Sequence, residues 1–259
     1  MSPTRRLLLS CLALAVAVVL AVALVGQLLD RGSAGPRAPA VAQDVPGTVV
    51  LVPGYGGSTS ALEVLAGRLR TAGRVAVVVQ LPGGGTDDLR TYVPVLEAAV
   101  HAALDTGAPS VDVVGYSAGG VVARLWESAG GTSVTRRVVT LGSPHHGTRV
   151  AGVGARYAPA ACPQACRQLV PGSDLLDGLN EGDETPPGPA WLSLWTDVDE
   201  TVTPPDSARL EGATNLSLQA LCPGVTTGHS QLPRDPHVQG VVLAALGAGP
   251  LAAPTSCPV

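Results

Sequence analysis

The clearest chemical pattern in this sequence is the pentapeptide Gly115-Tyr116-Ser117-Ala118-Gly119. It follows a short β-rich run at residues 111–114 and precedes a helix-compatible stretch at residues 120–126. A strand, a tight turn carrying a serine, and a helix are the parts of a nucleophile elbow, which lifts the serine hydroxyl out of the backbone. The flanking glycines lack a Cβ and so relieve crowding in such a turn. The spacing therefore predicts that Ser117 is a nucleophile.

A serine hydroxyl needs a histidine to take its proton and an acid to orient that histidine, and in parallel α/β proteins with this elbow the chain order is Ser, acid, His. His229 fits this order because it lies in the loop after the last expected strand. His237, at the start of the following helix, is the alternative. His101 precedes the serine on an amphipathic helix, and we interpret it as a helix-surface residue. His145 and His146 come too early to leave room for an acid on the next strand.

The acid is expected in the loop after the strand at residues 190–196. Asp199 begins the pattern D-x-x-V-x-P there, and its carboxylate would bond the far imidazole nitrogen of the base. Asp197 and Asp206 compete for this role, since position alone does not separate them.

An oxyanion formed at the substrate carbonyl needs two backbone N–H donors. Ala118, directly after the nucleophile, should supply one. The glycine-rich loop at residues 52–58 should supply the other, from Tyr55 or Gly56. The same loop lacks the Gly-Lys-Ser/Thr ending of a phosphate-binding P-loop.

Short valine-rich runs alternate with helical stretches along the chain, which indicates a mostly parallel sheet with helices on both faces. We expect helices at residues 61–72, 89–104, 119–128 and 236–246. We expect strands at residues 48–52, 74–81, 111–114, 137–141, 190–196 and 214–219.

The pattern breaks down at residues 144–189, which carry Gly, Pro and two cysteines. Long irregular insertions are usually lids or binding loops, so this one is expected to frame the substrate entrance. The apolar residues around positions 150–157 would suit such an entrance. A solvated surface excursion is the alternative.

Four cysteines remain once Cys11, in the N-terminal apolar run, is set aside. An even number outside the cytoplasm suggests two disulfides with three possible pairings. Proximity in the sequence favours Cys162–Cys166, which leaves Cys222–Cys257 to tie down the C-terminal tail. No spacing typical of a zinc site is present, so no metal is expected.

The first 29 residues have the organisation of a signal peptide or an N-terminal membrane anchor, with Arg5 and Arg6 before an uncharged stretch at residues 7–29. Residues 30–46 form a Pro/Gly/Ala linker, and residues 47–259 form one domain. We therefore expect a secreted protein, or one anchored on the outer face of the cell membrane.

The charge balance narrows the partners. Removing the four arginines and one aspartate of residues 1–40 from totals of 16 and 20 leaves 12 basic and 19 acidic residues. A net charge near −7 argues against nucleic acid and against attraction to anionic membranes. A monomer is expected.

Five segments together resemble the α/β-hydrolases of the small bacterial lipase type, the class 2 lipases. They are residues 52–57, 115–120, 141–148, 199–204 and 228–229, and the resemblance spans residues 46–247. It implies the α/β-hydrolase fold, a Ser117–His229–Asp199 triad, and no metal or organic cofactor.

The resemblance also settles two choices left open above. In such lipases the first motif usually reads His-Gly where this chain has Pro53-Gly54, so Tyr55 inherits the oxyanion N–H. It favours Asp199 over Asp197. It also makes residues 141–148 an edge of the cleft, with its two histidines not catalytic.

The expected function is cleavage of carboxylic esters of lipids or related acyl compounds through an acyl-enzyme. An acyltransferase with the same triad is one alternative. A catalytically silent lipid-binding protein is another.

Overall fold

The computed structural model describes residues 41–258. The expected signal peptide or anchor and most of the expected linker lie outside these residues. Within residues 41–258, no helix combines the length and the apolar character needed to cross a bilayer.

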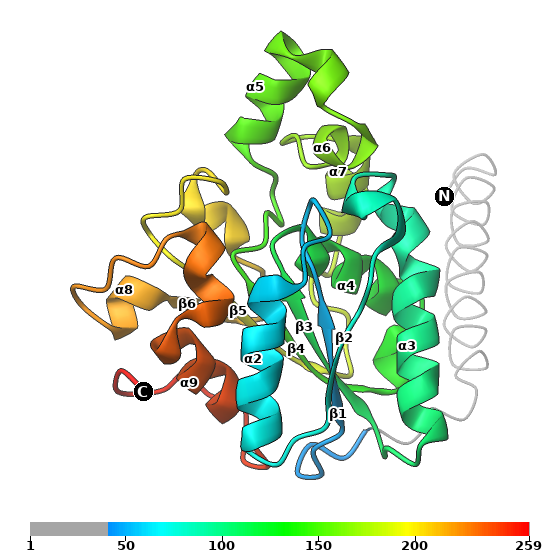
Figure 1. Cartoon of the computed structure of the whole chain (residues 1–259), viewed down its shortest axis with the longest axis vertical. Coiled ribbons are helices and arrows are strands. Elements are labelled where there is room, and N and C mark those ends of the chain that lie inside the picture. Colours follow the sequence, from blue (N-terminus) through cyan, green and yellow to red (C-terminus); the bar gives the residue numbers. More distant parts are fainter. Residues whose placement is uncertain (1–40, 259) are drawn as a thin grey trace, which may run out of the picture. The chain divides into compact units, whose positions relative to one another are not determined.

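The centre of the fold is a six-stranded sheet in the order β2-β1-β3-β4-β5-β6, and every neighbouring pair is parallel (Figure 1). This confirms the expected parallel sheet. Because all strands point the same way, their carboxyl ends meet at one edge of the sheet. The strands are β1 (Thr48–Val52), β2 (Ala76–Val78), β3 (Val111–Tyr116), β4 (Thr135–Leu141), β5 (Ala190–Trp195) and β6 (Thr214–Ser217).

Helices cover both faces of the sheet (Figure 1). Alternate residues of β1 serve the two faces, since Val50 and Val52 belong to one core cluster and Val49 and Leu51 to the other. The first cluster contains apolar side chains of α3 (Val93–Asp105) and α4 (Ala118–Ser128). The second contains those of α2 (Ser60–Thr71) and α9 (Pro236–Ala245).

Several expected elements differ at their ends; the strand expected at residues 74–81, for example, is only Ala76–Val78, and two of the differences have a clear local cause. The stretch expected as one helix at residues 89–104 is a 3₁₀ turn, Leu89–Tyr92, followed by α3, because Pro94 suits the first turn of a new helix. The expected strand at residues 214–219 ends at Ser217, whose hydroxyl accepts the Ala220 N–H and caps α8 (Leu218–Leu221).

The insertion at residues 144–189 is more regular than its weak periodicity indicated. It contains three short helices, α5 (Arg149–Tyr157), α6 (Gln164–Gln168) and α7 (Asp174–Asn180). The Thr148 hydroxyl caps α5 and the Ser173 hydroxyl caps α7. For helices this short, a capping residue indicates where a helix begins even though the hydrophobic periodicity is too weak to predict it.

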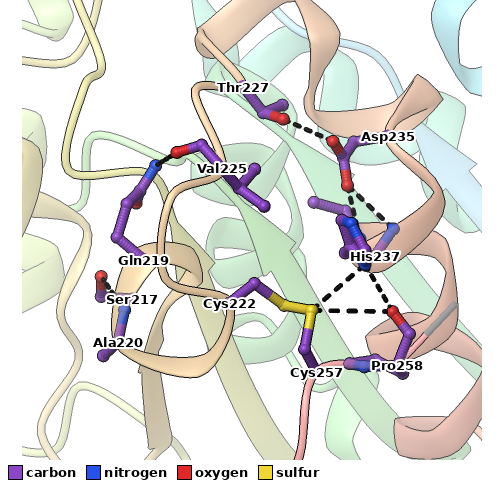
Figure 2. Close-up of a disulfide and its surroundings, with 11 residues drawn as sticks. Ser217, Gln219, Ala220, Cys222, Val225, Thr227, Asp235, His237, Cys257 and Pro258 are labelled. Carbon is purple, nitrogen blue, oxygen red and sulfur yellow. Dashed lines mark hydrogen bonds between the residues drawn. A yellow bond between two sulfur atoms is a disulfide. The ribbon is translucent and has the colours of Figure 1, made fainter.

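Both expected disulfides, Cys162–Cys166 and Cys222–Cys257, are present. The second joins the segment after α8 to the C-terminal tail. Figure 2 shows His237, at the start of α9, beside it: its Nδ1 donates to the Pro258 carbonyl at 2.7 Å and lies 3.2 Å from the Cys257 Sγ. The tail is thereby fixed against the helix that follows the His229 loop.

A buried carboxylate at the opposite edge of the sheet is paired with two arginines. Asp112 of β3 is inaccessible to solvent and accepts from Arg136 at 2.6 Å and from Arg74 at 2.7 Å. The same arginines donate to backbone carbonyls of residues 246 and 247. A guanidinium has five donors and can serve a carboxylate and several carbonyls at once.

Glu127, in the last turn of α4, is 1% exposed, and its carboxyl oxygens accept no hydrogen bond from the described part of the chain. Burial raises the pKa of Glu127 to about 8. Folded protein therefore holds this proton over a pH range in which the unfolded chain, with a carboxyl pKa of 4.5, has lost it.

We predict that wild-type stability falls as the pH rises from about 4.5 to about 8, and that Glu127→Gln removes this loss. Between pH 4 and pH 7 the variant should gain about 3 kcal/mol relative to wild type, from 1.36 kcal/mol per pH unit. Urea unfolding at a series of pH values measures the difference. Glu97→Gln, at an exposed position of α3, is the control. Parallel stability curves for wild type and Glu127→Gln would contradict the prediction.

Candidate active site

The turn between β3 and α4 has the strained backbone of a nucleophile elbow. Ser117 has φ +53° and ψ −128°, and among the described residues it is the sole non-glycine with positive φ. Such a conformation persists only when its surroundings hold it in place. The Ser117 N–H donates to the Leu141 carbonyl at 2.9 Å, which ties the turn to the end of β4.

Two glycines let the backbone close around this turn. A Cβ on Gly54, in the loop after β1, would lie 2.8 Å from the Cβ of Ser117. A Cβ on Gly119 would lie 2.2 Å from the Val52 carbonyl oxygen. The elbow is thus packed directly on the end of β1 and the loop that follows it.

Three polar side chains from separate loops form one hydrogen-bonded chain. The Nε2 of His229 lies 3.0 Å from the Oγ of Ser117, and its Nδ1 lies 2.7 Å from the Oδ2 of Asp199. Ser117 follows β3, Asp199 follows β5, and His229 opens the 3₁₀ turn His229–Arg234 before α9. The parallel register brings these loops to the same edge of the sheet.

Asp199 is held by the backbone of its own loop. It is 5% exposed, and its Oδ1 accepts the N–H groups of Thr201 at 2.8 Å and Val202 at 2.7 Å. Its second oxygen is left for His229. The bond to Asp199 therefore fixes the orientation of the imidazole, with Nε2 pointing at Ser117.

Sequence reasoning did not find Gly142 or Tyr116 as site residues. Gly142 has φ +56°, and a Cβ there would lie 3.2 Å from the Nδ1 of His229 and 3.3 Å from the Oδ2 of Asp199. The Tyr116 hydroxyl donates to the His229 carbonyl at 3.2 Å. Burial and the Asp199 charge raise the pKa of Tyr116 to about 12. Both residues belong to recognised motifs, but the contacts join distant segments.

The expected oxyanion donors are adjacent in sequence to residues that form or pack against the elbow, since Ala118 follows Ser117 and Tyr55 follows Gly54. Ala118 is the first residue of α4, so no earlier helical turn supplies an acceptor for its N–H. A Cβ on Gly54 would lie 2.8 Å from the Ser117 Cβ, so the residue before Tyr55 packs against the nucleophile. Gly56 has φ +88° and shapes the same loop.

The competing residues lie elsewhere. Asp197 accepts from Trp195 and Ser217, and Asp206 is exposed on the 3₁₀ turn Pro205–Ala208. Among the histidines, His237 binds the C-terminal tail, His101 is exposed on α3, and His146 bonds Glu184 at 2.8 Å. His145 is fully buried against Thr140, and this burial holds the pKa of its imidazole well below the ordinary value.

The insertion is fastened to the elements that carry the site. Arg124 of the nucleophile helix donates to the carbonyls of Leu179 and Glu184 and to the Oδ1 of Asn180. Burial lowers the pKa of Arg124 to about 10. At the other end, the Thr148 hydroxyl donates to the Thr201 carbonyl. Thr201 belongs to the loop at residues 197–204 that carries Asp199, which we call the acid loop.

One cluster in the described region has ligand-type atoms close together, namely Cys222, His237 and Cys257. Both sulfurs are bonded to each other, so neither is a thiolate ligand. The donor set does not fit a metal centre.

Comparison with solved structures gives the same fold. Lipase B of Aspergillus fumigatus matches with a TM-score of 0.68 at 20% identity, over 84% of this chain and 56% of that one. A mature Bacillus licheniformis lipase matches at 0.58 and 22% identity, over 66% and 82%. The Rhodococcus sp. esterase RhEst1 matches at 0.52 and 17% identity, over 80% and 92%. The matched part of the Aspergillus lipase is thus little more than half of its length.

A search of curated proteins finds no match. The sequence pattern of the family described as Lipase (class 2) matches residues 95–237, more than half of the chain. That span runs from α3 to the start of α9 and includes Ser117, Asp199 and His229. The protein therefore belongs to the class 2 lipase family, a family of carboxylic ester hydrolases.

Proposed function

We propose that this protein hydrolyses carboxylic esters of lipids or related acyl compounds, with Ser117, His229 and Asp199 as its catalytic triad. The observation that carries the proposal is the unbroken hydrogen-bonded chain from the Ser117 Oγ through the imidazole to the buried carboxylate. Membership of the class 2 lipase family supports the same reaction.

In the proposed reaction His229 Nε2 takes the hydroxyl proton while the Ser117 Oγ attacks the ester carbonyl. The proton then passes to the leaving alcohol, and an acyl-serine remains. Water, deprotonated by the same imidazole, releases the acid and restores Ser117. Asp199 keeps a proton on Nδ1, so that Nε2 is the nitrogen that accepts.

The negative charge that forms on the carbonyl oxygen would be met by the N–H groups of Ala118 and Tyr55. Support for this comes from the contact between Gly54 and Ser117 and from the unshared N–H at the start of α4. The positive end of the α4 dipole points to the same place.

The proposed site of action is outside the cytoplasm, as a secreted or membrane-anchored enzyme. Two observations support it. The N-terminal sequence has the organisation of a signal or anchor, and two disulfides are typical of oxidising compartments.

Ser117→Ala is expected to lower kcat for p-nitrophenyl butyrate about 10⁴-fold or more, because the nucleophile is lost. Asp199→Asn should cost about 10⁴-fold by favouring the wrong imidazole tautomer. Steady-state kinetics measure both effects. Ser133→Ala is the control, because the Ser133 hydroxyl bonds only a local carbonyl on the exposed surface. Equal turnover by wild type and Ser117→Ala would contradict the proposed triad. No turnover by wild type would favour a binding protein.

Gly142→Ala is expected to lower kcat about 100-fold with a smaller effect on KM, since its Cβ would meet Leu232 Cδ1 at 2.7 Å and crowd the His229–Asp199 pair at 3.2–3.3 Å. The positive φ at this position adds strain. Gly67→Ala is the matched control, because a Cβ there meets no atom within 4 Å. A kcat within threefold of wild type, in a folded Gly142→Ala protein, would show that the pair tolerates the methyl group.

A further inference from the structure

We propose that α5 and the turn after it form a docking surface for membranes rich in anionic phospholipid. This inference deepens the proposed function, since a lipid bilayer would present both the surface and the ester. The binding itself does not depend on catalysis.

Three large apolar side chains of α5 face solvent. Val150 is 48% exposed, Val153 is 58% exposed and Tyr157 is 74% exposed. Their spacing of three and four residues places them on one side of a helix. Residues 158–161 continue this exposed apolar surface, and all four are Ala or Pro. We call residues 150, 153 and 157–161 the apolar stripe.

The rest of α5 is held by the body of the domain. Ala151 is buried, and Gly154 lies close enough to the Cys162–Cys166 disulfide that a Cβ there would be 3.5 Å from the Cys166 Sγ. The Arg149 N–H donates to the Thr203 carbonyl in the acid loop. The stripe is thereby fixed relative to the triad. Figure 1 shows α5 at the extreme of the domain beyond the carboxyl ends of the strands.

The charge on residues 128–173, which carry the stripe, is of one sign. No Asp or Glu occurs between Glu127 and Asp174, whereas Arg149, Arg156 and Arg167 are exposed in that stretch. Arg149 and Arg156 are seven residues apart, so they lie along one edge of the stripe. The Arg156 guanidinium also lies 5.5 Å from the centre of the Tyr157 ring.

Acids do occur on the elements that contact this segment, since Asp87 and Asp88 precede the 3₁₀ turn that contacts α6, and Asp174 and Asp177 lie on α7. Asp88 lies 3.7 Å from Arg90 and also accepts from Gln168. Asp199 is buried with His229. Asp197 and Glu200 are the exposed acids of the loop that holds the start of α5.

An apolar stripe edged by arginines fits an anionic lipid surface. The side chains of the stripe would enter the boundary between headgroups and acyl chains, while the arginines contact phosphates. The chain as a whole is acidic, but charges act on a membrane only within a Debye length of about 8–10 Å. The local sign at α5 therefore decides the contact.

The test places a reporter on α5 itself, because the apolar N-terminal stretch could bind lipid independently. Tyr157→Trp is made in the full chain with Ser117→Ala, which prevents hydrolysis of the vesicles. Its fluorescence is followed with phosphatidylcholine vesicles carrying brominated acyl chains, with and without phosphatidylglycerol. Val64→Trp, also made with Ser117→Ala, is the matched control on an exposed position of α2. Because the chain has three native tryptophans, the Ser117→Ala protein alone supplies the background that is subtracted.

The added emission of the Tyr157→Trp protein should shift to the blue and be quenched by the brominated chains when phosphatidylglycerol is present. That of the Val64→Trp protein should not respond. Arg149→Gln with Arg156→Gln should weaken partitioning about fivefold per arginine, and added salt should do the same. Arg68→Gln, on α2, should have no effect.

Equal quenching of the reporter and control proteins, no quenching in reporter protein that sediments with the vesicles, or no preference for phosphatidylglycerol would overturn the proposal. A blue shift of the reporter that depends on protein concentration without lipid would instead assign the stripe to contact with a second copy. Hydrolysis of soluble p-nitrophenyl acetate by protein that retains Ser117 separates failure of this surface from failure of the proposed catalysis.

Discussion

The left-handed backbone of Ser117 is the constraint on which the rest of the site depends. A non-glycine residue in such a region costs about 1–3 kcal/mol, and the surrounding structure has to supply it. Here the strained conformation is stabilised by the hydrogen bond to the Leu141 carbonyl, by the helix that begins at the next residue, and by close backbone contacts at Gly54 and Gly119. The same contacts bring the ends of β1, β3 and β4 together, which is where two proposed N–H donors and the nucleophile must meet.

Much of this arrangement is readable from sequence because it depends on local chemistry and chain order. Short β-rich runs predicted all six strands, and the valine-rich ones, β1, β3 and β4, are buried almost throughout, as expected for strands covered on both faces. Ser117 and His229 followed from an elbow pattern and from the order of loops after parallel strands, whereas the resemblance to class 2 lipases favoured Asp199 over Asp197. The Cys162–Cys166 disulfide followed from proximity along the chain, and the Cys222–Cys257 disulfide joins the two cysteines that were left. Each of these signals lies within a short segment or in the order of segments.

The contacts that were not predicted join residues far apart in the chain. Gly142 clears space for the His229–Asp199 pair, Tyr116 bonds the backbone of His229, and Arg124 bonds the end of the insertion. No periodicity or local propensity encodes such a contact. The net charge near −7 of residues 41–259 likewise does not indicate that residues 128–173 contain no acid. Composition averages over surfaces that meet different partners.

Arg124 has a consequence for how substrate reaches the nucleophile. It belongs to the helix that starts next to Ser117, yet three of its donors are used by residues 179–184. Swinging that part of the insertion aside would leave a buried guanidinium without acceptors, and a charge in that state is costly. Residues 179–184, at the end of the insertion, are therefore a fixed part of the structure around the nucleophile helix and are not expected to open and close.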